Sequence, residues 1–149
     1  MGGSAIRELM TSFPLAAWWD RDYQFEGSTV PFTASEYPYY LQPAMSTGTM
    51  PCSSEGGGKI RADGDATVII ACSTHQGGGA SRPTGFQSYQ KIGGTGEANN
   101  DGTLGLAMLN HGSGSGRNVI HYFKGTVTAG THTICCSHGW ATGVFLQHM

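Results

Sequence analysis

The sequence predicts an all-β protein: a single antiparallel β-sandwich or jelly roll of about seven to eight strands, with an extended N-terminal arm. Residues 52–149 carry twenty of the 24 glycines, and short runs of Val, Ile, Leu and Thr lie between them. Turn signals separate these runs at intervals of roughly 8–15 residues, which is typical of a sandwich. Residues 1–51 instead carry five of the six prolines and nine of the fifteen aromatic residues. The change at Pro51 divides the chain into an arm, residues 1–51, and a β-sandwich domain, residues 52–149.

The arm has too much proline for a continuous sheet or helix and too many aromatic residues for a solvated linker. A short helix is expected over residues 4–9, with Ser4 as its N-cap and Pro14 as its limit. We expect the arm to lie on a partner's surface and to be dispensable for folding. Packing of its rings against the domain's own core is the alternative, because aromatic residues serve cores and interfaces alike. Six aromatic residues form the expected contact: Trp18, Trp19, Tyr23, Tyr37, Tyr39 and Tyr40.

Seven segments of the second part are predicted strands. The clearest is ATVIIACS at residues 66–73, an apolar run that follows a Asp-Gly-Asp turn. Glycine-rich or Asn/Asp-rich loops separate the others, and residues 103–110 and 117–124 alternate in the two-residue period of a strand. The predicted strands are residues 59–62, 66–73, 86–92, 103–110, 117–124, 131–138 and 143–148.

Charge is scarce, and the eight Lys and Arg residues are dispersed. The formal net charge is −2 and the charged residues make up 12% of the chain, with no basic run. Neither nucleic acid nor an acidic membrane is therefore an expected partner. No apolar stretch reaches the ~18 residues of a membrane span, and the N-terminus does not match a secretory signal. We expect a protein that is made and used without secretory export.

The C-terminal segment carries no formal charge at all after Lys124. Depletion of charge with retained aromatic residues is typical of the centre of an interface, whereas an exposed strand pair normally keeps some charge against edge pairing. We therefore expect a homo-oligomer, with a trimer as the favoured state. The expected subunit contacts are Val127, Ile134, Trp140 and Phe145.

The four cysteines match no zinc-binding spacing. Cys135 and Cys136 are adjacent, so on a strand they point to opposite faces and cannot both ligate one ion. Reduced core thiols are the expectation, because small buried cysteines are common. One bridge from Cys72 to Cys135 or Cys136 is the alternative.

No catalytic, metal or cofactor site is predicted. His132 and His138 share a face of their predicted strand, but they lie about 20 Å apart if extended and cannot bind one ion. A metal would need histidines from several strands or from several subunits, so hydrogen-bonded histidines are the expectation. Ser88 and Lys91 match S-x-x-K, but they lie in a predicted strand and lack the companion motifs of that active site.

Two stretches resemble the β-sandwich modules of bacteriophage fibre and decoration proteins. DGDATVIIA at residues 63–71 is similar to the Gly-Asp turn that leads into an apolar strand, and RPTGF at 82–86 is similar to the turn that follows a flexible loop. The strand at 102–108 and the hairpin at 128–134 continue the resemblance over roughly residues 58–148. The resemblance implies a structural or receptor-contacting role with no cofactor and no catalytic residues.

These observations together favour a non-enzymatic structural protein of a tailed-phage virion, which decorates or cements the shell. It would be made in the host cytoplasm and then reside in the virion, with other copies of itself and the major capsid or tail protein as partners. The alternative is a carbohydrate- or receptor-binding module of the fibre type. Exposed rings stack on sugars, and Trp140 beside His138 is the C-terminal candidate for such contact.

Overall fold

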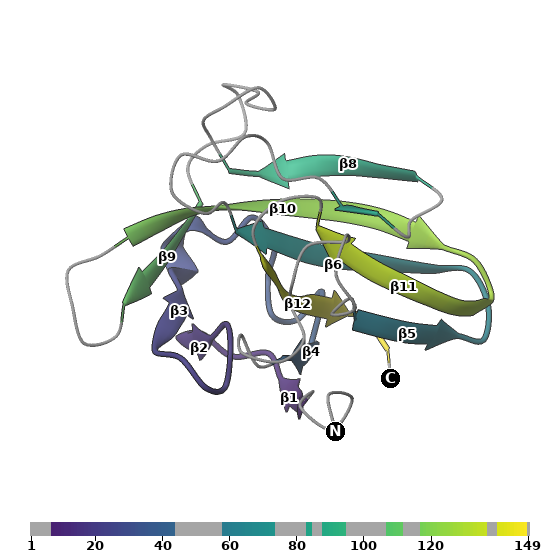
Figure 1. The fold of residues 1–149 in the computed structure, drawn as a ribbon, viewed down its shortest axis with the longest axis horizontal. Helices are drawn as coiled ribbons and strands as arrows, with labels where there is room; N and C mark the ends of the chain where they lie inside the picture. Colours follow the sequence, from purple (N-terminus) through teal and green to yellow (C-terminus); the bar gives the residue numbers. More distant parts are fainter. Residues whose placement is uncertain are drawn as a thin grey trace.

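The computed structural model describes residues 7–43, 58–73, 83–84, 88–94, 107–111, 117–136 and 140–148. Within these ranges every regular element is a strand except one 3₁₀ turn, η2 (Gly27–Thr29), which confirms the all-β prediction (Figure 1). The strands are β1 (Arg7–Met10), β2 (Leu15–Ala16), β3 (Tyr23–Phe25), β4 (Tyr39–Gln42), β5 (Gly58–Ala62), β6 (Ala66–Ser73), β7 (Pro83–Thr84), β8 (Ser88–Gly93), β9 (Met108–His111), β10 (Arg117–Val127), β11 (Gly130–Cys136) and β12 (Trp140–Leu146).

Nine strands form the main sheet, in the order β1-β4-β12-β6-β10-β9-β3-β2, with β8 also paired to β10. β10 has eleven residues and is long enough to pair with β9 near its start and with β8 along its second half. A second sheet has the order β5-β11-β7. All of the described pairings are antiparallel, as the sequence predicts.

One corner produces the sandwich. β6 and β10 pair along eight positions that end at Ala66 and Val127, and beyond this pair both chains turn back. The turn on one side contains Gly64, as predicted, and β5 and β11 then pair with each other from Ala62 and Gly130 onward. The second sheet is therefore a continuation of the β6–β10 ribbon, and Figure 1 shows β11 crossing β6 with β5 beside β11.

The prediction of an extended arm is wrong for residues 7–43, because these residues supply four strands of the main sheet. β4 pairs with β12 on one side and with β1 on the other, and β3 pairs with β9. The four prolines of this stretch lie between strands, so they limit the length of each strand without preventing pairing. The expected helix is also wrong over residues 7–9, which belong to β1. Pairing with β4 satisfies the backbone groups of Arg7 and Leu9, and tertiary pairing outweighs a weak local helix preference.

The main sheet curls until β2 meets β4. The hydroxyl of Tyr40 donates a hydrogen bond to the carbonyl of Ala17 at 2.7 Å, and the side-chain amide of Gln42 donates one to the carbonyl of Ala16 at 2.9 Å. The backbone N–H of Trp19 donates to the carbonyl of Pro43 at 3.2 Å. These bonds close the curl without a regular strand ladder.

The larger core lies inside the curl. Phe145 of β12 is at its centre, with ring centroids 4.5 Å from Tyr40, 4.7 Å from Phe32 and 5.3 Å from Phe25. This aromatic core contains Leu15, Ala17, Trp18, Phe25, Tyr37, Tyr40, Ile69, Ala71, Ala107, Leu109, Ile120, Tyr122 and Phe145. Removal of residues 1–51 would take six of these side chains out of the centre of the molecule.

The second core lies between the two sheets. β6 contributes to both cores, because Ile69 and Ala71 face the curl while Val68 and Ile70 face the second sheet. This alternation explains why β6 reads as an unbroken apolar run. The second core contains Val68, Ile70, Cys72, Phe123, Val127, Cys136 and Val144.

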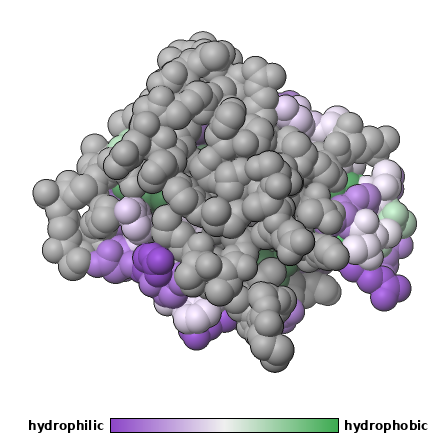
Figure 2. All heavy atoms as spheres, viewed as in Figure 1, coloured by the Kyte–Doolittle hydropathy of each residue, from purple (hydrophilic) through white to green (hydrophobic). Residues whose placement is uncertain are grey.

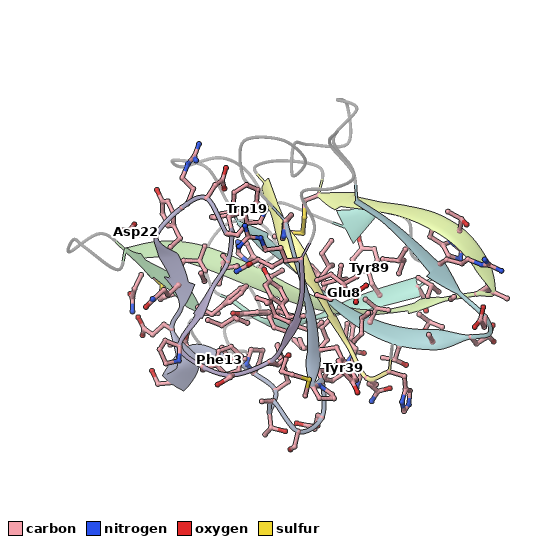
Figure 3. The ribbon with its side chains drawn as sticks, turned by 90° about the horizontal axis from the view of Figure 1, so that it is seen from below. Glu8, Phe13, Trp19, Asp22, Tyr39 and Tyr89 are labelled. Carbon is pink, nitrogen blue, oxygen red and sulfur yellow. A yellow bond between two sulfur atoms is a disulfide. The ribbon has the colours of Figure 1, made fainter. Side chains whose placement is uncertain are left out.

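A disulfide between Cys72 and Cys136 joins β6 to β11, and hence the main sheet to the second sheet (Figure 3, yellow bond). The expectation of reduced thiols is therefore wrong for this pair, and the alternative of a bridge is the correct one. The physical reason is the corner, which folds β11 over β6 and brings together two residues 64 positions apart.

We predict that replacing both Cys72 and Cys136 with Ala lowers the free energy of unfolding by about 4 kcal/mol, because the bridge closes a long loop in the unfolded chain. Urea unfolding of the oxidised protein and of the double variant measures this difference. Wild-type protein in reductant should match the double variant, and the variant should not respond to reductant. Equal unfolding midpoints for all four samples would contradict the prediction.

Candidate interaction surface

The structure separates the six aromatic residues that the sequence assigns to a partner. Trp18, Tyr37 and Tyr40 are 2%, 3% and 0% exposed and belong to the aromatic core, so their assignment to a capsid contact is wrong. Tyr23 and Tyr39 are partly buried. Trp19 alone among the six is exposed, at 39%. Trp18 and Trp19 lie in a bend and a turn after β2, where the Trp18 ring enters the core and the Trp19 ring does not.

Two of the four expected subunit contacts lie inside the protomer. Val127 and Phe145 are both 0% exposed, and their assignment to an interface is wrong. The segment lacks charge because β11 and the end of β12 enclose the two cores, and a core excludes unpaired charge as strongly as an interface does. The side chains of Ile134 and Trp140 lie outside the described residues.

An exposed surface remains at the β1 end of the main sheet, and we call Arg7, Glu8, Met10 and Trp19 the β1 surface. The Arg7 guanidinium lies 4.4 Å from the centre of the Trp19 ring, a cation–π contact. β4 positions both residues, because Arg7 pairs with Gln42 and the N–H of Trp19 bonds to the next residue, Pro43. Met10 is 64% exposed, the largest value among the exposed large hydrophobic residues of the described chain.

Charged residues border this surface. Asp20 and Arg21, directly after Trp19, form an ion pair at 3.2 Å, and Asp22 next to them is exposed. Figure 3 labels Trp19 and Asp22 on the segment between β2 and β3, and Glu8 on β1. In Figure 2 the coloured atoms are mostly hydrophilic and the hydrophobic ones form small separate areas. A patch with one large exposed ring and mixed charge is suited to protein or sugar contact.

Sequence reasoning found Trp19 but missed Arg7 and Met10. Their exposure depends on where β4 lies, which no local pattern reveals. The one available signal is the alternation of charged and apolar residues over residues 7–10, which fits an edge strand as well as a helix start.

His121 is a buried polar residue away from the β1 surface. It is 1% exposed, it pairs with the disulfide residue Cys72 across β10 and β6, and its ring packs against Gly94. Neither ring nitrogen has a hydrogen-bond partner. Burial, with a smaller repulsion from Lys91, lowers the pKa of His121 from 6.5 to about 4, so the ring is neutral at neutral pH.

The described part of the chain contains no group of three potential metal ligands. His132 follows the hydrogen-bonded expectation, because its Nε2 donates to the carbonyl of Thr128 at 2.7 Å. No helix in the described ranges has the length and hydropathy to cross a membrane.

The chain matches no protein-family model, no curated protein and no solved structure.

We predict that His121 makes the protein less stable in mild acid. The pKa is lower in the folded protein than in the unfolded chain, so between pH 6.5 and about 4 the unfolded chain binds a proton that the folded protein does not. The contribution of the neutral ring is fully present well above pH 6.5, and about 3 kcal/mol of stability is lost as the pH falls to 4. Urea unfolding at a series of pH values measures the loss.

His121→Leu should remove this component of the pH dependence, while His132→Gln, at a partly exposed position of β11, should keep it. Equal pH profiles for the wild type and His121→Leu would show that the imidazole is not the group responsible.

Proposed function

We propose that this protein is a non-enzymatic structural component of a tailed-phage virion, a decoration or cement protein that binds the major capsid or tail protein through the β1 surface. The observation that carries the proposal is the Trp19 ring, exposed at the end of the main sheet and held there by Arg7. Two further features support it: the resemblance of residues 58–148 to phage fibre and decoration modules, and a fold whose two sheets are joined by a disulfide.

The attachment that we propose uses a surface of the folded domain of this protein. Trp19 and Arg7 belong to the residue types that dominate binding energy at interfaces. Their mutual contact and the Trp19–Pro43 hydrogen bond fix them before binding, which lowers the entropy lost on association. Residues 7–43 therefore contribute to attachment as strands of the domain, in place of the flexible arm expected from the sequence.

A homotrimer would present three copies of this surface to a repeating lattice. Multivalent attachment raises the overall affinity above that of one weak contact without any new interaction. The trimer is part of the proposal and rests on the resemblance alone.

We predict that Trp19→Ala weakens association with coat-protein shells by about 30-fold, because a central ring at an interface contributes about 2 kcal/mol. The measurement is co-sedimentation of the purified protein with undecorated shells of the virus that encodes it.

Tyr89→Ala is the matched control. Tyr89 is 41% exposed, close to the 39% of Trp19, but it lies on β8, and four strands separate β8 from β1 in the main sheet. Loss of binding in both variants, or in neither, would contradict a contact centred on Trp19.

A second candidate function is carbohydrate or receptor binding at the same place. The favouring observation is the position of Asp20, Arg21 and Asp22 directly after the exposed Trp19 ring, because sugars stack on rings while charged side chains bond their hydroxyl groups. A glycan array on the isolated protein distinguishes the two functions. Binding that Trp19→Ala abolishes, without association with shells, would favour recognition.

A further inference from the structure

We infer that the β1 surface binds an extended segment of its partner protein, which joins the main sheet as an additional strand beside β1. This inference names the mode of binding at the surface on which the proposed function rests. Strand addition of this kind draws its affinity from main-chain hydrogen bonds and its selectivity from alternate side chains.

The backbone groups of β1 point in two directions, toward β4 and toward the free edge of the sheet. β1 is the first strand in the order of the main sheet, and β4 is its one strand neighbour in the described chain. The N–H of Thr11, one residue beyond β1, bonds to the carbonyl of Pro38 at 2.8 Å and so points toward β4. Hydrogen-bonded and non-hydrogen-bonded pairs alternate along an antiparallel ladder. Arg7 and Leu9 therefore bond to β4, and the N–H and C=O groups of Glu8 and Met10 point to the free edge.

The side chains of β1 determine which added strand would fit. Leu9 packs against the aromatic core and Arg7 lies over Trp19, so these two side chains share one face. Glu8 and Met10 are exposed on the other face. An antiparallel strand would place one residue opposite each of these four, and opposite charges and apolar pairs stabilise such positions. Read from its N-terminus, the fitting segment has two apolar residues, opposite Met10 and Leu9, then a basic and an acidic residue.

A second copy of this chain fits poorly as the added strand. A two-fold axis between two antiparallel β1 strands keeps each side chain on the same face of the sheet. Two opposed residues must therefore both have even residue numbers or both have odd ones. Two such registers pair three residues of β1. One places Glu8 opposite Glu8, and the other places Glu8 opposite Met10. Both leave a carboxylate without an opposite charge, which favours a different protein as the source of the strand.

The charges of β1 make it selective for the strand that it pairs with. Short, charged edge strands resist unspecific pairing. β1 has four residues, two of them charged, and it therefore admits a strand only when the charges match. The Arg7 guanidinium lies 4.4 Å from the centre of the Trp19 ring, and a carboxylate on the added strand opposite Arg7 would pair with it.

The test uses the full-length protein and two blocked hexapeptides, Thr-Val-Ile-Lys-Glu-Thr and its charge-exchanged form Thr-Val-Ile-Glu-Lys-Thr. Binding is followed by NMR titration, and amide hydrogen exchange reports the N–H groups of Glu8 and Met10. We expect the first peptide to bind about tenfold more tightly than the second, since exchange places like charges opposite both Glu8 and Arg7. The two amides should exchange more slowly in the complex.

Matched variants separate the backbone from the side chain. Met10→Pro removes an N–H that points to the free edge. The variant should therefore still fold, but it should no longer bind the peptide. Met10→Ala keeps the N–H and should retain most of the binding. Glu8→Pro provides a second test of an outward N–H. Unfolding of both proline variants would overturn the inference, because it would show that these groups bond within the fold.

The inference is also overturned if neither peptide binds, if both bind equally, or if Met10→Pro binds as the wild type does. Peptide binding without association with coat shells would contradict the proposed function and still support strand addition. Shell binding that Met10→Pro does not change would keep the proposed function and remove the strand addition.

Discussion

The stacking of Tyr40 on Phe145 joins the first part of the chain to the last. The two rings lie 4.5 Å apart with their planes at 29°, and both residues are 0% exposed. They are also direct partners in the β4–β12 ladder, so ring contact and backbone pairing act at the same position. Gly143 makes this close packing possible. Its φ of +128° lies where other residues are strained, and a Cβ there would collide with the carbonyl of Leu41 and the hydroxyl of Tyr40.

The rest of the architecture depends on this junction. With β4 fixed against β12, the hydroxyl of Tyr40 reaches the carbonyl of Ala17 and closes the curl of the main sheet. The same strand supports β1 on its other side and anchors Trp19 through Pro43. The exposed surface on which the proposed function rests is thus a consequence of how the aromatic core is filled.

The sequence is informative where structure is local and limited where it is not. The boundaries of β6 match the prediction, because a strand buried on both faces is an uninterrupted apolar run between turns. The strands of residues 7–43 have two to four residues each, and their pattern is too short to read. Phe145 is apolar in an uncharged segment, and that composition describes a core and an interface equally well. The bridge between Cys72 and Cys136 follows from the corner of the sandwich, which has no signature in the spacing of the cysteines. Of the β1 surface, composition reveals Trp19, whereas Arg7 and Met10 become significant only once β4 is in place.

Amide hydrogen exchange on the isolated wild-type protein tests most directly whether residues 7–43 belong to one cooperative fold. If β3 and β4 are integral to the core, the protected amides of Phe25 and Tyr40 should exchange as slowly as those of Ile69 and Tyr122, because opening them requires global unfolding. If instead the amides of residues 7–43 exchange quickly as a group while those of β6 and β10 remain protected, these residues form a separable arm and the account given for the fold is contradicted.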